Sequence, residues 1–160
     1  MNGLHVNNLS ISYLGEHADV TAVKSVSFSI AQGEIFALVG ESGSGKSTIA
    51  QTLLRILPPP GVVVGGDIEF NGQSLLTRDY QTGHTLRWSQ IAMVFQSALN
   101  ALNPTLTVAG HFKDTFQQHG IVDLADIQKR MYRLLKMTDL PENCVSLPAT
   151  VACNKSLYKK

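Results

Sequence analysis

Hydrophobic and polar positions alternate over three stretches in the first half of the chain. Alternation over residues 4–11 and again over residues 26–30 predicts two antiparallel strands around a polar loop. Ile68 and Phe70 alternate with acidic residues, and the Asn71-Gly72 dipeptide that follows is typical of a tight hairpin turn. The pattern therefore predicts a small antiparallel β region.

Two short runs are continuously apolar instead of alternating. Residues 35–39 read Ile-Phe-Ala-Leu-Val, as expected for a central strand buried on both faces, and residues 91–95 predict a second short strand that ends at Gln96. A helical spacing of apolar residues begins at Ile49 and continues to Leu57, where Pro58 ends it. This order of strand, turn and helix predicts an α/β fold.

The second half of the chain is expected to be helical. The pattern predicts one helix over residues 108–118 and another over residues 123–137, the latter with one apolar face. The face consists of Leu124, Ile127, Met131, Leu134 and Leu135. No clear period follows Pro141, so residues 141–160 are predicted to form an unstructured tail.

Between the first apolar run and its helix lies a glycine-rich phosphate-binding pattern, a P-loop. Residues 40–48 read Gly-Glu-Ser-Gly-Ser-Gly-Lys-Ser-Thr, with a strand predicted before and a helix after, which is the context that the motif requires. Its glycines allow backbone N–H groups to turn towards phosphate oxygens, and the helix N-terminus adds further donors. The predicted phosphate-binding residues are Gly40, Glu41, Ser42, Gly43, Ser44, Gly45, Lys46, Ser47 and Thr48.

Individual roles follow from the chemistry of this motif. Lys46 is expected at the β- and γ-phosphates, Ser47 on Mg²⁺ and Thr48 at the α-phosphate. A P-loop alone does not distinguish ATPases, GTPases and small-molecule kinases. The chain has neither the Asn-Lys-x-Asp base reader of GTPases nor the arginine-rich lid of small kinases.

The residues around the P-loop resemble the opening of an ATP-binding cassette (ABC) domain. The resemblance rests on Tyr13, the stretch of residues 26–30 and the Gly33-Glu34 turn that precedes the P-loop. It implies that Tyr13 stacks on adenine, the alternative being a tyrosine that packs at a strand edge. The implied fold is the N-terminal portion of a P-loop NTPase, with an antiparallel β subdomain and the start of a helical subdomain.

A second segment strengthens the resemblance. Residues 91–96 are similar to the Q-loop of that family, about fifty residues after Lys46, which implies that Gln96 binds Mg²⁺ and senses the γ-phosphate. Residues 95–104 and 39–48 together look most like the importers of dipeptides, oligopeptides and nickel. The implied cofactors are ATP and Mg²⁺, and the implied partners are transmembrane permease subunits and a second ATP-binding subunit.

Three family motifs are missing from the sequence: the Leu-Ser-Gly-Gly signature, the Walker B strand ending in Asp-Glu and a switch histidine. Because these groups hold Mg²⁺ and polarise the attacking water, the chain alone is expected not to hydrolyse ATP. We interpret residues 1–140 as a partial nucleotide-binding domain, and the end of the resemblance as the mark of an interrupted or frameshifted gene. An inactive relic that binds nucleotide weakly or not at all is the alternative.

Charge, apolar runs and cysteine spacing limit which partners and which cellular location the sequence predicts. The formal net charge is +1, which provides no basic field for a nucleic-acid backbone. The sequence shows no secretory signal and no apolar run near the roughly 18 residues that span a bilayer. Cys144 and Cys153 fit no zinc spacing, so we expect free thiols, and the scattered histidines are assigned no metal. The expected location is cytoplasmic, peripheral on the inner face of the membrane, without direct insertion.

Overall fold

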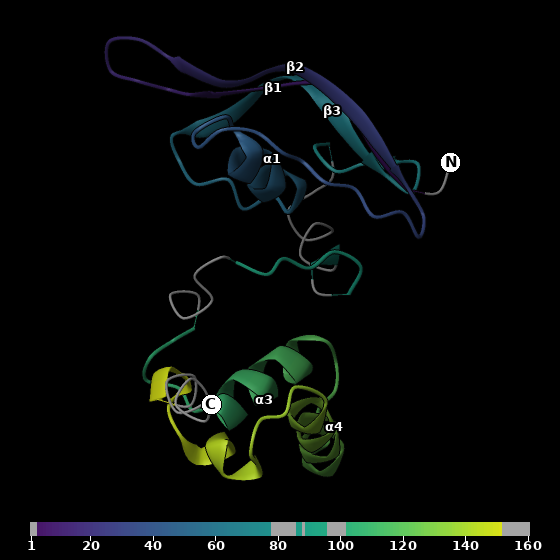
Figure 1. The fold of residues 1–160 in the computed structure, drawn as a ribbon, viewed down its shortest axis with the longest axis vertical. Helices are drawn as coiled ribbons and strands as arrows, with labels where there is room; N and C mark the ends of the chain where they lie inside the picture. Colours follow the sequence, from purple (N-terminus) through teal and green to yellow (C-terminus); the bar gives the residue numbers. More distant parts are fainter. Residues whose placement is uncertain (1–2, 78–85, 88, 96–101, 152–160) are drawn as a thin grey trace. The chain divides into compact units, whose positions relative to one another are not determined.

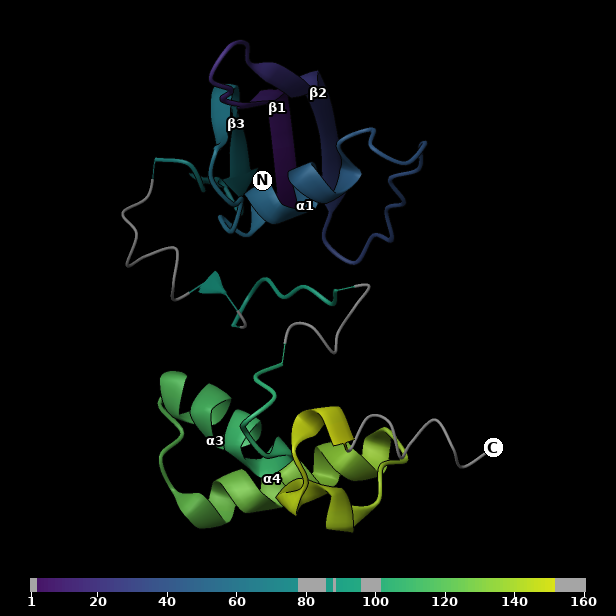
Figure 2. The same cartoon turned by 90° about the vertical axis from the view of Figure 1, so that its left-hand side faces the viewer.

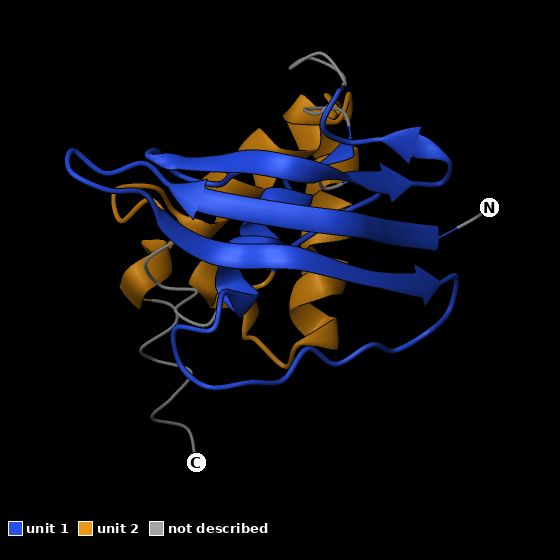
Figure 3. Ribbon diagram, turned by 90° about the horizontal axis from the view of Figure 1, so that it is seen from above, with its two compact units in different colours: residues 1–93 blue, residues 94–160 orange. Residues whose placement is uncertain are grey.

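A computed structural model describes residues 3–77, 86–87, 89–95 and 102–151. The chain divides into two compact units, Met1–Met93 and Val94–Lys160, which are coloured separately in Figure 3. Each unit has its own hydrophobic core. Within the described residues, the first unit holds the sheet and the second holds only helices.

The first unit is built on a four-stranded antiparallel sheet in the order β2-β1-β3-β4. Its strands are β1 (Gly3–Tyr13), β2 (Val20–Ala31), β3 (Gly61–Phe70) and β4 (Gln73–Ser74). The predicted antiparallel strands are confirmed, and both are longer than the alternation indicated. The Asn71-Gly72 turn is confirmed as well, since Phe70 pairs with Gln73 across it.

Helix α1 (Lys46–Leu53) packs against one face of this sheet (Figures 1 and 2). Ile49 is buried among strand residues that lie on the same face, including Leu9, Ile11 and Ile68, none of which is exposed to solvent. The helix is shorter than predicted, because Arg55 adopts a left-handed conformation (φ 55°) two residues after its end. This packing fixes the N-terminus of α1 relative to β1 and β2.

The predicted central strand over residues 35–39 is wrong for this structure. The segment has no strand partner among the described residues, and Ile35 and Val39 are 98% and 86% exposed. Only Phe36 finds an aromatic neighbour, stacking on Phe28 with ring centroids 5.0 Å apart. A strand that is apolar on both faces needs hydrogen-bonded neighbours on both sides, and no described segment provides them.

The predicted strand over residues 91–95 is also wrong. Ile91 forms a single isolated bridge to Arg87, and residues 92–95 are irregular. Val94 is 91% exposed. As with residues 35–39, the apolar sequence favours a buried strand, but the described residues contain no neighbouring strand that would pair with it.

The second unit contains α3 (Val108–Gln118), α4 (Leu124–Met137) and the short 3-10 helix η2 (Glu142–Ser146). Thr107 caps α3 and Asp123 caps α4, each accepting hydrogen bonds from backbone N–H groups of the first turn. Both predicted helices are confirmed. On the predicted apolar face of α4, Ile127, Met131 and Leu135 are buried, whereas Leu124 and Leu134 are exposed.

The predicted unstructured tail differs from the structure over residues 142–151. Cys144 is 3% exposed and packs with Met131 and Leu135 of α4. Pro148 forms an isolated bridge to Thr107, and Ala149 is buried. The physical reason is that these few apolar side chains complete the core of the helical unit, which periodicity in a short segment does not reveal. Residues 152–160 lie outside the described part.

Candidate phosphate-binding site

The P-loop encloses the ammonium group of Lys46. Lys46 Nζ donates hydrogen bonds to the carbonyl oxygen of Gly40 at 2.8 Å, to Ser44 Oγ at 3.0 Å and to the carbonyl oxygen of Glu41. These three acceptors match the three donors of an ammonium group. The loop therefore holds its one positive charge at the centre of the backbone turn, where an anion would be attracted.

Two glycines of the loop lie close to neighbouring atoms. A Cβ atom on Gly40 would lie 2.9 Å from Ser44 Oγ, one of the acceptors of Lys46. Gly45 is left-handed (φ 85°), and a Cβ there would lie 2.5 Å from the carbonyl oxygen of Ala22 in β2. At Gly45 both the left-handed backbone and the contact with β2 require glycine, whereas at Gly40 a larger residue would displace the Ser44 hydroxyl.

The N-terminus of α1 offers free backbone donors. Gly45 caps the helix without any side-chain hydrogen bond, and the first turn contains no acidic residue. The first N–H groups of a helix have no partner within it, and the helix dipole places partial positive charge there. An open hollow of about 120 Å³ is lined by residues 43–48 at this point. The geometry suits an anionic oxygen group of phosphate size.

The two hydroxyl residues after Lys46 have different surroundings. Ser47 is exposed in the first turn of α1, whereas Thr48 is 9% exposed. A free serine hydroxyl beside bound phosphates is a hard oxygen ligand of the kind that Mg²⁺ takes. Ser47 therefore fits the predicted role in metal binding. Among the described residues, no group of three or more His, Cys, Asp or Glu side chains could hold a metal ion by itself.

Tyr13 lies at the end of β1 and next to the P-loop helix. Its backbone pairs with Val20 of β2 and Gly61 of β3, and its side chain is half-buried. The Tyr13 hydroxyl lies 3.3 Å from Thr48 Oγ1, within hydrogen-bonding distance. The structure thus brings the predicted adenine-binding residue to the predicted phosphate-binding helix. Sequence reasoning missed this contact, because no local pattern signals a pairing of residues 35 positions apart.

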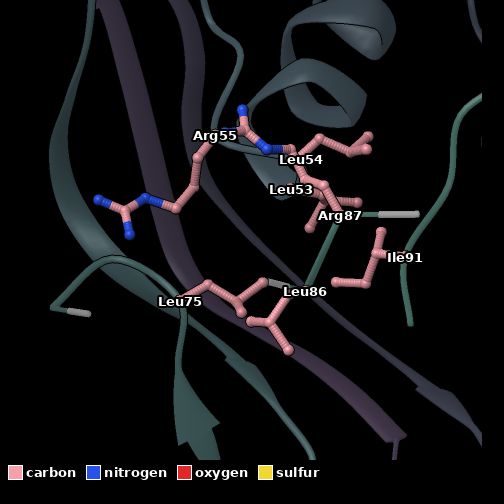
Figure 4. Close-up of a pocket in the computed structure, with 7 residues that line it drawn as sticks. All are labelled: Leu53, Leu54, Arg55, Leu75, Leu86, Arg87 and Ile91. Carbon is pink, nitrogen blue, oxygen red and sulfur yellow. The ribbon is translucent and has the colours of Figure 1, made fainter. Parts of the chain in front are cut away.

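The predicted Q-loop residue Gln96 lies outside the described residues, so its role stays a prediction. The segment before it closes a small pocket behind the end of α1, shown in Figure 4. The cavity measures about 10 Å³, room for about one water molecule, and its walls include Leu53, Leu75, Leu86 and Ile91. It is a packing gap in the core and not a nucleotide site.

Comparisons with known proteins identify the family of the chain. A family model described as "ABC transporter" matches residues 23–153. The chain is 37% identical over 138 residues to the dipeptide transport ATP-binding protein DppD of Caldanaerobacter subterraneus subsp. tengcongensis, covering 82% of this chain and 42% of that protein. It is 34% identical over 139 residues to the oligopeptide transport ATP-binding protein OppD of Bacillus subtilis, covering 86% and 39%. The chain thus spans about two fifths of the length of these relatives.

Solved structures show the same fold. A dimeric ATP-binding cassette in a post-hydrolysis state, bound to ADP and Pi, superposes with a TM-score of 0.77 at 25% identity, over 91% of this chain and 61% of that one. The predicted fold class, part of an ABC-type nucleotide-binding domain with an antiparallel β region and helices, is confirmed. In the part of the chain that is described, no helix has the length and apolar character needed to cross a membrane. The match over most of the sequence and the shared fold show that the chain belongs to the ABC transporter family.

Proposed function

We propose that this chain binds the triphosphate of ATP, together with Mg²⁺, through its P-loop. The observation that carries the proposal is the position of Lys46, whose ammonium group lies between three loop oxygens beside the free N-terminus of α1. A cation and a set of unpaired N–H groups that converge on one hollow are what a polyphosphate needs. The solved cassette bound to ADP and Pi supports nucleotide as the ligand class.

Mg²⁺ would be held by Ser47 and, on the prediction from sequence, by Gln96. When bound, the ion would neutralise phosphate charge. The chain's own residues would position the phosphates. Lys46 would exchange its hydrogen bonds to loop oxygens for hydrogen bonds to the β- and γ-phosphates, and the backbone of residues 40–45 would surround them. The 160 residues contain no Asp-Glu pair after an apolar strand, so we expect the chain by itself to bind ATP without measurable hydrolysis.

Thermal unfolding with and without MgATP tests the proposal. A ligand that binds only the folded chain stabilises it by about 2.7 kcal/mol at a hundredfold excess over Kd. We expect Lys46→Met to remove most of this stabilisation, because it removes the charge at the centre of the loop. Lys136→Met, at an exposed position in the last turn of α4, is the matched control and should leave the MgATP effect unchanged.

The same experiment addresses the alternative, an inactive relic. No shift in melting at millimolar MgATP would contradict ATP binding and favour the relic. Equal shifts for wild type and Lys46→Met would place the nucleotide elsewhere on the chain. Release of inorganic phosphate by the wild-type chain would contradict the expectation that it lacks hydrolysis.

At the level of the whole protein, we propose the ATP-binding subunit of an importer for peptides or related small solutes. The support is the similarity to DppD and OppD, whose names state dipeptide and oligopeptide transport. The proposed partners are permease subunits and a second ATP-binding subunit, and the proposed location is the cytoplasmic face of the membrane. Uptake of labelled dipeptides by cells with and without the gene is the direct test, and unchanged uptake would contradict the proposal.

A further inference from the structure

The contact between Tyr13 and Thr48 is a polar link between the sheet and the P-loop helix. The two hydroxyl oxygens lie 3.3 Å apart, and either can donate. Thr48 lies in the first turn of α1 and is 9% exposed, so water has little access to its hydroxyl. Tyr13 is fixed by strand pairing on both sides. A rigid strand residue therefore orients a hydroxyl at the start of the helix.

From this geometry we propose that the Tyr13 hydroxyl is a positioning group for phosphate binding, acting through Thr48 and independently of any contact of its ring with a nucleotide base. The inference rests on the proposed function, since it assigns a second role to a residue beside the same site. The ligand of this positioning group is the phosphate chain. The effect of the Tyr13 hydroxyl on affinity should therefore be the same for inorganic tripolyphosphate as for ATP.

The chemistry of hydroxyl groups supports this relay. Each hydroxyl has one hydrogen and two lone pairs, so Thr48 can accept a hydrogen bond from Tyr13 while it donates its own hydrogen to a phosphate oxygen. Hydrogen bonds in such a chain polarise and strengthen one another. If the tyrosine hydroxyl is missing, the Thr48 hydroxyl is free to rotate towards the helix backbone, as threonine often does within a helix. Its orientation towards the ligand is then lost.

Two substitutions separate the possible roles of Tyr13, which are stacking of the ring on a base and positioning of Thr48 by the hydroxyl. Tyr13→Phe removes the hydroxyl and keeps the aromatic ring, whereas Tyr13→Leu removes both. Stacking on a base is possible only for ATP, while the relay contributes equally to ATP and to tripolyphosphate. Comparing the two ligands across the two variants therefore distinguishes a contribution of the ring from a contribution of the hydroxyl.

The test is isothermal titration of the full chain with ATP and with tripolyphosphate, each with Mg²⁺. We expect Tyr13→Phe to weaken both ligands by the same factor, about three- to tenfold for one lost hydrogen bond. Tyr13→Leu should weaken ATP further but tripolyphosphate no more than Tyr13→Phe does. Tyr132→Phe, a half-buried tyrosine in the helical unit, is the control for removal of a hydroxyl and should change neither affinity.

A double-mutant cycle assigns the effect to Thr48. In a Thr48→Val background Tyr13→Phe should cost nothing more, and in a Thr48→Ser background its full effect should remain. An unchanged affinity of Tyr13→Phe for tripolyphosphate, or a loss that persists beside Thr48→Val, would overturn the inference. If the wild-type chain binds neither ligand, the proposed function fails as well, which separates that outcome from failure of the relay alone.

Discussion

Two glycines of the P-loop share a left-handed backbone but differ in what surrounds them. Gly45 has φ 85° and Gly43 has φ 81°. A Cβ atom on Gly45 would lie 2.5 Å from the carbonyl oxygen of Ala22 and 3.0 Å from Val23 Cγ2, whereas a Cβ on Gly43 would meet no heavy atom within 4 Å. Substituting each by alanine therefore separates the cost of the conformation from the cost of the contact.

The magnitudes follow from these two terms. A left-handed alanine costs about 1–2 kcal/mol, so both variants should lose that amount of unfolding free energy. Gly45→Ala also forces α1 away from the backbone of β2. Overpacking of this kind costs about 1–3 kcal/mol more. We expect losses of about 1–2 kcal/mol for Gly43→Ala and about 2–5 kcal/mol for Gly45→Ala. The larger loss is a substantial fraction of the roughly 5–15 kcal/mol typical of a folded domain.

The assay is urea unfolding of the nucleotide-free chain, followed by far-UV circular dichroism. Hydrogen exchange at the amides of β2 provides a local reading, because the displaced helix packs on that strand's neighbours. Gly45→Ala should increase exchange at Ala22 and Val23, and Gly43→Ala should not. Equal losses of stability in the two variants would refute the reasoning, since it would mean that α1 does not pack against β2 as described.

Three further predictions concern the cores, the caps and the exposed apolar segment. Ile68→Ala removes a side chain with no exposed surface and should cost about 2–5 kcal/mol in urea unfolding; a loss under about 1 kcal/mol would mean that the site is not tightly packed. Asp123→Ala removes the cap of α4 and should lower the free energy of unfolding by about 1 kcal/mol. Arg130→Ala breaks an exposed ion pair and should lower it by less than about 0.5 kcal/mol. A larger loss for Arg130→Ala than for Asp123→Ala would contradict the capping geometry. Ile35→Asp should change unfolding by under about 0.5 kcal/mol while reducing self-association in light scattering; a large loss would show that residue 35 is buried.

Elements whose partners are close in sequence could be predicted well from sequence. The two helices of the second unit carry their own caps and their own apolar stripe, and α3 was predicted with the bounds Val108–Gln118 that it has. The β3–β4 hairpin depends on the conformation of two residues, Asn71 and Gly72, which both have positive φ. Local chemistry decides these elements, so a single sequence contains the information.

Elements that depend on distant neighbours could not be predicted. The run over residues 35–39 has the composition of a strand buried on both faces, but a strand exists only where other segments pair with it. Nearly all of Ile35 and Val39 is exposed in the structure. Around Cys144 the sequence predicts an unstructured tail because it shows no periodicity, yet the segment is held by packing against α4. In both cases the missing information was which surfaces meet.

The candidate site has a part that is local in sequence and a part that depends on the fold. The loop, its lysine and its helix N-terminus lie within residues 40–48, so their geometry is a property of a short segment placed on a core by Ile49. Tyr13 reaches Thr48 only because β1 runs between β2 and β3 with the register that ends at Tyr13. Phosphate binding should therefore tolerate changes in the sheet that leave α1 in place, while the contribution of Tyr13 should be lost with any shift of β1 by one residue, which turns its side chain to the other face.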